Sequence, residues 1–302
     1  DHRLPEPELA EGDGLTRARG TRRRTAGAAL GTVPFFAFVA VFLLVPTGVV
    51  VVQAFLTDAG APTLDNIREL GNRDIRQALV NSVILSGVTA IVGAVVGAVI
   101  AYAVATARSD GVLRRVVSAA SGVLAQFGGV MLAFAWIATL GLSGLVPVFL
   151  RDHLGVDVNT SWLYNLSGFV LVYLYFQIPL MVIVFLPSID GMRPQWREAT
   201  ESLGGTTWQY WRSVAGPLLA PAFLSSALLL FANALSAYAT AAALNAQSTF
   251  ILPLQIGNAI GSEVVLGRQN VAKALALEMV VIVAIVMIGY TWLQRRAERW
   301  LG

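Results

Sequence analysis

The sequence Glu198-Ala199-Thr200-Glu201-Ser202-Leu203-Gly204 begins a polar stretch that continues to Val214-Ala215-Gly216-Pro217, and long apolar runs lie on both sides of it. The whole chain of 302 residues is 56% hydrophobic and only 13% charged, with a mean hydropathy of +0.68. Soluble domains carry roughly 25% charged residues. The composition therefore predicts a membrane protein, in which this polar stretch meets water outside the bilayer.

Six apolar segments are long enough to cross a bilayer, for which a helix needs roughly 20 apolar residues. They are residues 28–56, 76–107, 115–140, 165–187, 217–243 and 273–294. We therefore predict an all-α membrane protein with about six transmembrane helices, in a single domain over residues 25–302. Residues 1–24 are polar and contain proline and glycine, which predicts a disordered cytosolic tail. The first apolar segment is too long for the core of a cleaved signal peptide, so a retained helix is favoured.

The arginines predict how the segments are oriented across the membrane. With the N-terminus inside, 15 of the 21 basic residues fall in the tail, the loops that contain residues 108–115 and 188–216, and the C-terminal end. The other 6 fall in the outside loops. Cytoplasmic loops of membrane proteins carry an excess of Lys and Arg. Both termini and the polar stretch are therefore predicted to be cytoplasmic.

Within the polar stretch, the residue types predict a short helix with defined ends. Residues 194–203 begin with Pro-Gln and read as about two turns, with Glu198 and Glu201 near the start, where carboxylates favour the helix dipole. Gly204 and the glycine after it end this helix, because glycine tolerates the left-handed conformation. Pro217 suits the first turn of the fifth span.

The spacing of these residues resembles the EAA loop of the membrane subunits of binding-protein-dependent ABC importers. That pattern runs Glu-Ala-Ala, three residues, Gly, nine residues, Ile, one residue, Leu-Pro. The residues that match in register are Glu198, Ala199, Gly204 and Pro217. The substituted positions are Thr200, Val214 and Gly216, and they leave the spacing unchanged. The loop also precedes the penultimate span, as it does in the family.

The resemblance to type I importer permeases extends over about residues 30–300. Asn81-Ser82 at the start of the second span, Gly144 after the third, and the stretch Thr249 to Ile256 carry it further. The branch that serves polyamines, thiamine, ferric iron, sulfate and phosphonates is the most similar. Residues 125–129 depart from the proline-rich segment that many members carry there, so the sequence does not assign a substrate.

The resemblance implies a function and a set of partners. The chain would be a permease subunit of the bacterial cytoplasmic (inner) membrane, forming half of a substrate pathway. A cytosolic ATPase dimer would dock on the coupling residues, which are Glu198, Ala199, Glu201, Gly204 and Pro217. The other implied partners are a second permease subunit, identical or paralogous, an extracytoplasmic substrate-binding protein and membrane lipid. Nucleic acid is not among them.

The chain itself is not predicted to be an enzyme. It contains no Gly-x-x-x-x-Gly-Lys phosphate-binding loop, so ATP and Mg²⁺ would be bound by the partner ATPase. It has no cysteine and only two histidines, which argues against a metal site. No cofactor is predicted in this chain.

Polar residues inside the spans are candidates for the substrate pathway, because burying them costs free energy unless they are paired or face water. The candidates are Gln126, Gln177, Asn233, Ser236, Tyr238 and Glu278. Each also has a structural interpretation, as a hydrogen bond between helices. Glu278, the only acid in a span, would either meet a cationic substrate or pair with Lys273.

Other classes of protein explain less of the sequence. The polar stretch could be an ordinary interfacial loop, but then its spacing has no explanation. A stand-alone secondary transporter of a small solute predicts an internal repeat with paired broken helices, and none is evident. A membrane enzyme needs a clustered catalytic set, which Glu278 alone does not supply.

Overall fold

The computed structural model describes residues 32–57, 59–107, 111–245, 250–261 and 269–301. Contacts divide the chain into two compact units, Asp1–Gln53 and Ala54–Gly302. Six of the described helical segments are long and apolar enough to cross a membrane, as the sequence predicts. The predicted tail, residues 1–24, lies outside the described residues, and the single domain over residues 25–302 stays a prediction.

The first unit contains one apolar helix, Thr32–Gln53. It includes a π-helical turn, η1 (Ala40–Leu44), which leads into α2 (Val45–Gln53). Pro46 follows this turn, and proline lacks an N–H and crowds the carbonyl four residues before it, so a wider turn accommodates it. Apolar residues surround the helix on all sides, as expected for a segment solvated by lipid.

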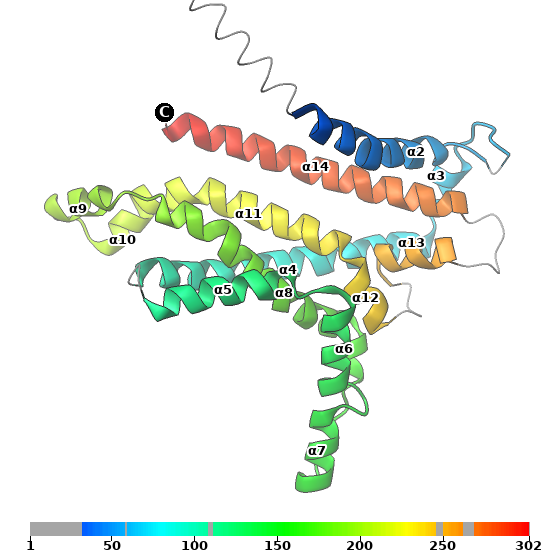
Figure 1. Cartoon of the computed structure of the whole chain (residues 1–302), viewed down its shortest axis with the longest axis horizontal. Helices are drawn as coiled ribbons and strands as arrows, with labels where there is room; N and C mark the ends of the chain where they lie inside the picture. The colour runs from blue at the N-terminus through cyan, green and yellow to red at the C-terminus, as the bar shows by residue number, and fades with distance from the viewer. Residues whose placement is uncertain (1–31, 58, 108–110, 246–249, 262–268, 302) are drawn as a thin grey trace, which may run out of the picture. The chain divides into compact units, whose positions relative to one another are not determined.

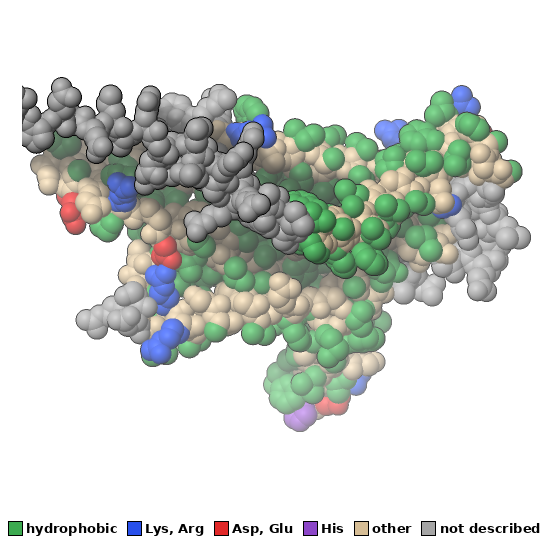
Figure 2. Space-filling model, turned by 45° about the horizontal axis from the view of Figure 1, so that its top comes forward, with side chains coloured by type: hydrophobic (Ala, Val, Ile, Leu, Met, Phe, Trp, Pro, Cys, Tyr) green, Lys and Arg blue, Asp and Glu red, His purple; other side chains and the backbone are tan. Residues whose placement is uncertain are grey.

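The second unit is helical over nearly all of its described residues. Its elements are α3 (Asp65–Glu69), α4 (Arg73–Thr106), α5 (Val112–Gln126), α6 (Gly129–Leu140), α7 (Leu145–Leu154), η2 (Ser161–Tyr164), α8 (Leu166–Asp190), α9 (Pro194–Ser202), α10 (Thr207–Tyr210), η3 (Trp211–Ala215), α11 (Gly216–Ser236), α12 (Tyr238–Leu244), α13 (Leu252–Gly261) and α14 (Gln269–Leu301). In Figure 1, α4, α5, α8, α11 and α14 run side by side, and α6 and α7 project steeply from them. Figure 2 shows charged side chains gathered near the helix ends, with hydrophobic side chains along the helices between them.

The third predicted span is not one continuous helix. Within residues 115–140, α5 ends at Gln126 and α6 begins at Gly129. Gly129 has φ +75°, a conformation that side chains with a Cβ rarely adopt. The segment that meets the length and composition of a span here is Gly129–Leu154, which includes α7. The glycine pair, unremarkable in an apolar run, therefore redirects the chain.

The fifth span is displaced toward the N-terminus relative to the prediction of residues 217–243. Helical structure runs without interruption from Thr207 to Ser236. Ala237, with φ −75° and ψ 81°, ends it, and α12 follows as a separate short helix. The small-residue tract 237–243 therefore forms its own element instead of extending the span.

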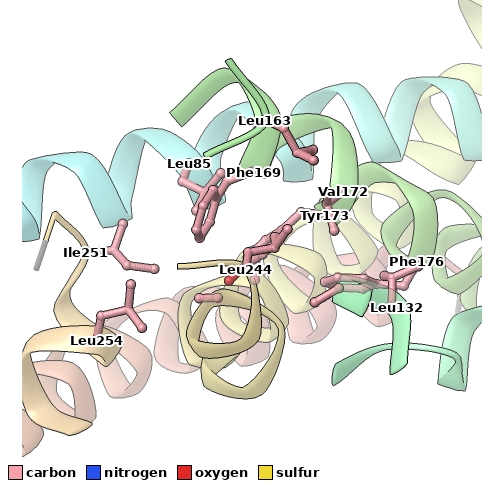
Figure 3. Close-up of a cluster of buried hydrophobic side chains, with 13 residues drawn as sticks. Leu85, Leu132, Leu163, Phe169, Val172, Tyr173, Phe176, Leu244, Ile251 and Leu254 are labelled. Atoms are coloured by element: carbon pink, nitrogen blue, oxygen red, sulfur yellow. The ribbon is translucent and has the colours of Figure 1, made fainter. Parts of the chain in front are cut away.

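A cluster of buried side chains joins α4, α6, α8, α12 and the start of α13 (Figure 3). Phe169 and Tyr173 of α8 lie at its centre, and both are almost fully buried. The ring of Phe169 meets Phe250 edge-on, with centroids 4.9 Å apart. Lipid tails are as apolar as a protein core, so burying apolar side chains gives no hydrophobic driving force between membrane helices. Close packing of this kind therefore holds the helices together.

Two glycines of α4 allow α8 to approach closely. A Cβ on Gly97 would lie 2.5 Å from Cβ of Met181 and 2.8 Å from the carbonyl oxygen of Ile178. A Cβ on Gly93 would lie 3.1 Å from Cβ of Gln177, whereas one on Gly87 would meet nothing within 4 Å. Close packing against α8 therefore requires glycine at positions 93 and 97 and not at Gly87.

The end of the unit that contains α13 is fastened by two residues that the sequence singled out. Asn81 donates a hydrogen bond from Nδ2 to the carbonyl of Phe250 at 2.9 Å. The Ser82 hydroxyl accepts one from the backbone N–H of Leu252 at 2.8 Å. Residues 250–256, the described part of the stretch Thr249 to Ile256 that carries the family resemblance, are thereby bound to α4.

Candidate coupling segment and pathway

The polar stretch forms a short, exposed helix at one end of the second unit. Three residues separate the end of α8 at Asp190 from the start of α9, and Pro194 occupies the first turn of α9. Proline suits that position because its N–H has no partner there. In Figure 1, α9 and α10 lie at the opposite end of the helices from α12 and α13. The segment is thus held between α8 and α11 and presents its surface away from the core.

The C-terminal end of α9 has a defined geometry. Gly204 adopts φ +74°, and its N–H donates to the carbonyl of Glu201 at 3.0 Å. The N–H of Gly205 donates to the carbonyl of Thr200 at 2.8 Å. These two bonds are a Schellman motif, which satisfies carbonyls that the helix end would leave free. The predicted glycine termination is therefore present.

The predicted placement of both glutamates near the start of α9 is wrong. The first turn contains no acidic residue, and Glu201 lies in the last turn. There the helix dipole disfavours a carboxylate, and Arg197 compensates, donating from Nε to Oε1 of Glu201 at 3.0 Å. This bond and the charge of Glu201 raise the pKa of Arg197. Glu198 and its neighbour Ala199 are exposed.

Two large apolar side chains beside α9 are exposed despite the polar surroundings. Leu203 is 89% exposed and Trp208 is 72% exposed. Thr206 forms a capping box with Gln209, in which Gln209 N donates to Oγ1 of Thr206 and Oε1 of Gln209 accepts from the N–H of Thr206. The turn between α9 and α10 is therefore bonded at both ends. A stiff polar segment with exposed apolar side chains is a surface suited to another protein.

The chain enters the fifth span through a π-helical turn instead of a fresh helix start. Pro217 is exposed and lies two residues after η3, in the first turn of α11 and inside a continuous helix, where its missing N–H and its ring require a wider turn. A Cβ on Gly216 would lie 2.5 Å from the carbonyl oxygen of Trp211. Gly216, which departs from the leucine of the EAA pattern, is therefore the residue that leaves room for this turn.

The structure gives Gln177 and Asn233 partners within the chain. Gln177 is fully buried on α8, and its Nε2 donates to the carbonyl of Leu230 on α11 at 2.7 Å. Asn233 Nδ2 donates to Oε1 of Gln177 at 3.2 Å. These bonds join α8 to α11, which matches the structural interpretation of Gln177. The remaining exposed part of Asn233 keeps it a candidate for the pathway.

The other polar candidates gather near the two helix breaks. Gln126 is the last residue of α5, and Ser236 is the last residue of α11, where its hydroxyl bonds the carbonyls of Ala232 and Asn233. Tyr238 begins α12, is 47% exposed, and lies so close to Gly257 that a Cβ there would meet its ring at 2.6 Å. Ser236 is also exposed.

The sequence did not reveal that the two breaks meet. The N–H of Gly129, at the start of α6, donates to Oγ1 of Thr240 on α12 at 2.8 Å. The hydroxyl of Tyr173 on α8 donates to the carbonyl of Ala237 at 2.6 Å. Backbone groups freed by a helix break inside a membrane need such partners. The glycine pair at 128–129 was the available signal for the first break, and nothing in the sequence paired it with Thr240.

Glu278 lies on α14, half-buried, and its Oε2 atom is buried with no hydrogen-bond partner. Lys273 is five residues away, about 140° around the helix, and does not bond this oxygen. A carboxylate buried in this way is costly unless something outside the chain compensates it. Among the described residues, no group of three or more His, Asp or Glu side chains is arranged to hold a metal ion.

Residues 93–301 match the protein family described as binding-protein-dependent transport system inner membrane component. The putative ferric transport system permease protein FbpB 1 of Haemophilus influenzae is 25% identical over 258 residues, covering 85% of this chain and 40% of that protein. The ferric transport system permease protein FbpB of Actinobacillus pleuropneumoniae is 24% identical over 196 residues, 65% of this chain and 28% of that protein. The chain thus spans less than half the length of either ferric relative.

The molybdenum transport system permease protein ModB of Haemophilus influenzae is 23% identical over 176 residues, covering 57% of this chain and 74% of that protein. Among solved structures, a bacterial ABC transporter involved in alginate import has a TM-score of 0.65 with 17% identity, over 94% of this chain and 99% of that chain. At this identity the likeness concerns the fold, and it confirms the all-α permease architecture. With 209 of its 302 residues matched, the chain belongs to the family of binding-protein-dependent transport system inner membrane components.

Proposed function

We propose that this chain is the membrane-spanning subunit of an ATP-driven importer. It forms half of the pathway for the cargo, and residues 194–207 receive the movement of a cytosolic ATPase. The observation that carries the proposal is the geometry of α9 in a chain of this family. The helix has a Schellman end at Gly204, a capping box follows it, and Leu203 lies exposed between them. Such a segment can transmit a displacement without losing its own helical structure.

The partners follow from the same proposal. A dimer of ATPase subunits binds ATP and Mg²⁺ and docks on α9, with Glu198, Ala199 and Glu201 at the contact. A second permease subunit completes the pathway, and an extracytoplasmic binding protein delivers the cargo. In support, one structure that shares the fold is described as an alginate ABC transporter in complex with alginate pentasaccharide-bound periplasmic protein.

The proposed orientation has both termini and α9 in the cytoplasm of a bacterial cell, with the spans in its inner membrane. The count of basic residues supports it, since 15 of 21 fall on the side of α9. The polar candidates near the helix breaks, together with Asn233 and Glu278, are proposed to line the pathway. Gln177 serves to hold α8 to α11 beside it.

The test of the function is to purify the tagged chain from its native cells in mild detergent and to identify what accompanies it. We expect an ATPase with a phosphate-binding loop, a second permease chain or copy, and ATP hydrolysis that rises when the binding protein and its cargo are added. A chain that purifies alone and transports a solute with an ion gradient would instead support the secondary transporter.

Replacing Glu278 with glutamine is expected to lower transport of a cationic cargo at least about tenfold, the equivalent of roughly 1.4 kcal/mol. The substitution keeps the shape and removes the charge that a cation would meet. Uptake of the cargo of the copurified binding protein is the measurement, with Glu69→Gln on exposed α3 as the matched control. Equal uptake of a cationic cargo by both variants would show that Glu278 has a structural role and does not meet the cargo.

A further inference from the structure

An ion pair joins the cytoplasmic-side ends of α5 and α8, close to the start of α9. The guanidinium of Arg114 bonds a carboxylate oxygen of Asp190, 76 residues further along the chain. Their side chains are 26% and 36% exposed, whereas the members of the other ion pairs among the described residues are 51–79% exposed. Each of those other pairs lies within one helix, so within the described part of the chain this pair alone links two.

Although α5 lies along α8, few of its apolar side chains belong to the buried clusters of the unit. Among the described residues, Val117 is the sole residue of α5 in the hydrophobic clusters of the unit. An open cavity of about 500 Å³ lies between the two helices, and Ser118, Leu186 and Asp190 are among the residues that line it. The ion pair is a polar contact between α5 and the end of α8, at the edge of this cavity.

The last turn of α8 lacks one of the backbone hydrogen bonds that would join it to the turn before. Pro187 has no N–H, so the carbonyl four residues before it has no helical partner there. Asp190, the residue that Arg114 binds, is in this turn. Only Gly191, Met192 and Arg193 then separate it from Pro194 of α9. Asp190 is the last residue of α8, so a displacement of α9 carried along the chain reaches it before any other residue of that helix.

Helix α5 leads from the ion pair to the middle of the protein. It ends at Gln126, beside the break before Gly129, and the N–H of Gly129 is bonded to Thr240 on α12. A second route leaves the coupling segment through Trp211, whose ring meets Tyr102 of α4 edge-on with centroids 5.1 Å apart. The two routes diverge at the segment, so removing one leaves the other in place.

We propose that Arg114 and Asp190 are positioning residues for coupling: their ion pair transmits the movement of α9 to α5 and so to the helix break at residues 127–129. The inference rests on the proposed function, since it needs an ATPase that moves α9. A route of this kind requires evidence of energetic coupling in addition to spatial connection. Variants that remove and then restore the pair supply that evidence.

The experiment uses the copurified complex in lipid nanodiscs and measures ATP hydrolysis with and without the loaded binding protein. Arg114→Ala and Asp190→Ala are each expected to lower the stimulated-to-basal ratio at least about fivefold, at the low end of measured couplings between sites. The exchanged pair Arg114→Asp with Asp190→Arg is expected to restore most of it. Arg151→Ala, which breaks the exposed pair with Asp152 on α7, is the matched control and should leave the ratio unchanged.

A second variant makes the result independent of whether the alanine substitutions assemble. The chain has no cysteine, so Arg114→Cys with Asp190→Cys adds a unique pair of thiols to it. A reversible bifunctional thiol reagent should raise the ratio in this variant, and its reduction should lower the ratio again, while the wild-type complex responds to neither. A merely structural role would change the yield of complex and leave this reversible change absent.

The outcomes separate the two proposals. If the wild-type complex shows no stimulated hydrolysis, the proposed function is wrong and the inference falls with it. If the wild type is stimulated and the alanine variants match it, only the inference is overturned. It is also overturned if neither the exchanged pair nor the cross-link restores the ratio.

Discussion

Leucine in place of Gly97 is expected to prevent α4 from packing on α8 and to remove most of the folded protein. A Cβ at this position would lie 2.5 Å from Cβ of Met181 and 2.8 Å from the backbone oxygen of Ile178. Neither neighbour is the movable end of a side chain, so the helices must separate. Overpacking of a core costs about 1–3 kcal/mol or more, and this contact joins two central helices.

The matched control is Gly87→Leu, ten residues earlier on the same helix, where a Cβ would meet nothing within 4 Å. The measurement is the yield of monodisperse protein after detergent extraction and its midpoint of thermal unfolding. We expect the Gly97 variant to aggregate or to unfold at a markedly lower temperature, and the Gly87 variant to behave as wild type. Similar behaviour of the two variants would contradict the packing assigned to Gly97.

Valine in place of Gly204 is expected to abolish stimulation of the ATPase while the spans still fold. No neighbour lies within 4 Å of the added Cβ, so the effect comes from the backbone, which has φ +74°. A residue with a Cβ pays roughly 1–2 kcal/mol in that conformation, and a β-branched one pays more. The Schellman bonds of Gly204 and Gly205 would then open and α9 would lose its defined end.

Gly155→Val is the matched control for Gly204. Gly155 ends α7 with φ +65° and also has nothing within 4 Å, so the local strain is the same at a site remote in the chain from α9. Gly204→Asn should retain much of the stimulation, since asparagine tolerates the left-handed conformation. Stimulated hydrolysis and membrane content are measured together. Normal stimulation of ATP hydrolysis in Gly204→Val would show that the defined end of α9 is not needed for coupling to the ATPase.

Several features were predictable because they depend on neighbouring residues alone. The glycine end of α9 follows from Gly204-Gly205, and the proline start follows from Pro194. The wrong prediction of the position of Glu201 in α9 also has a local cause. The helix begins at residue 194 and has 9 residues, so position 201 is next to last, and a count of residues from the start would have placed it near the C-terminal end.

The breaks in the third and fifth spans were not predictable from hydropathy. Residues 115–140 and 217–243 are predominantly apolar, and such a composition permits a continuous helix as readily as two pieces. The breaks persist because distant groups satisfy the freed backbone: Thr240 bonds Gly129, and Tyr173 bonds the carbonyl of Ala237. Contacts between residues 64 and 111 positions apart leave no local pattern to find.

The sequence alone determined that the chain crosses a membrane about six times and that a polar segment with fixed spacing separates two spans. Composition and turn residues decide these properties, because each acts through the solvent or through its neighbours. Only the tertiary structure decided which polar residues are bonded within the chain. Gln177 forms a hydrogen bond that joins α8 to α11, and Asp190 forms an ion pair with Arg114. Oε2 of Glu278 has no hydrogen-bond partner. Whether a buried polar group is satisfied depends on the helix that lies opposite it, and that helix is chosen by packing.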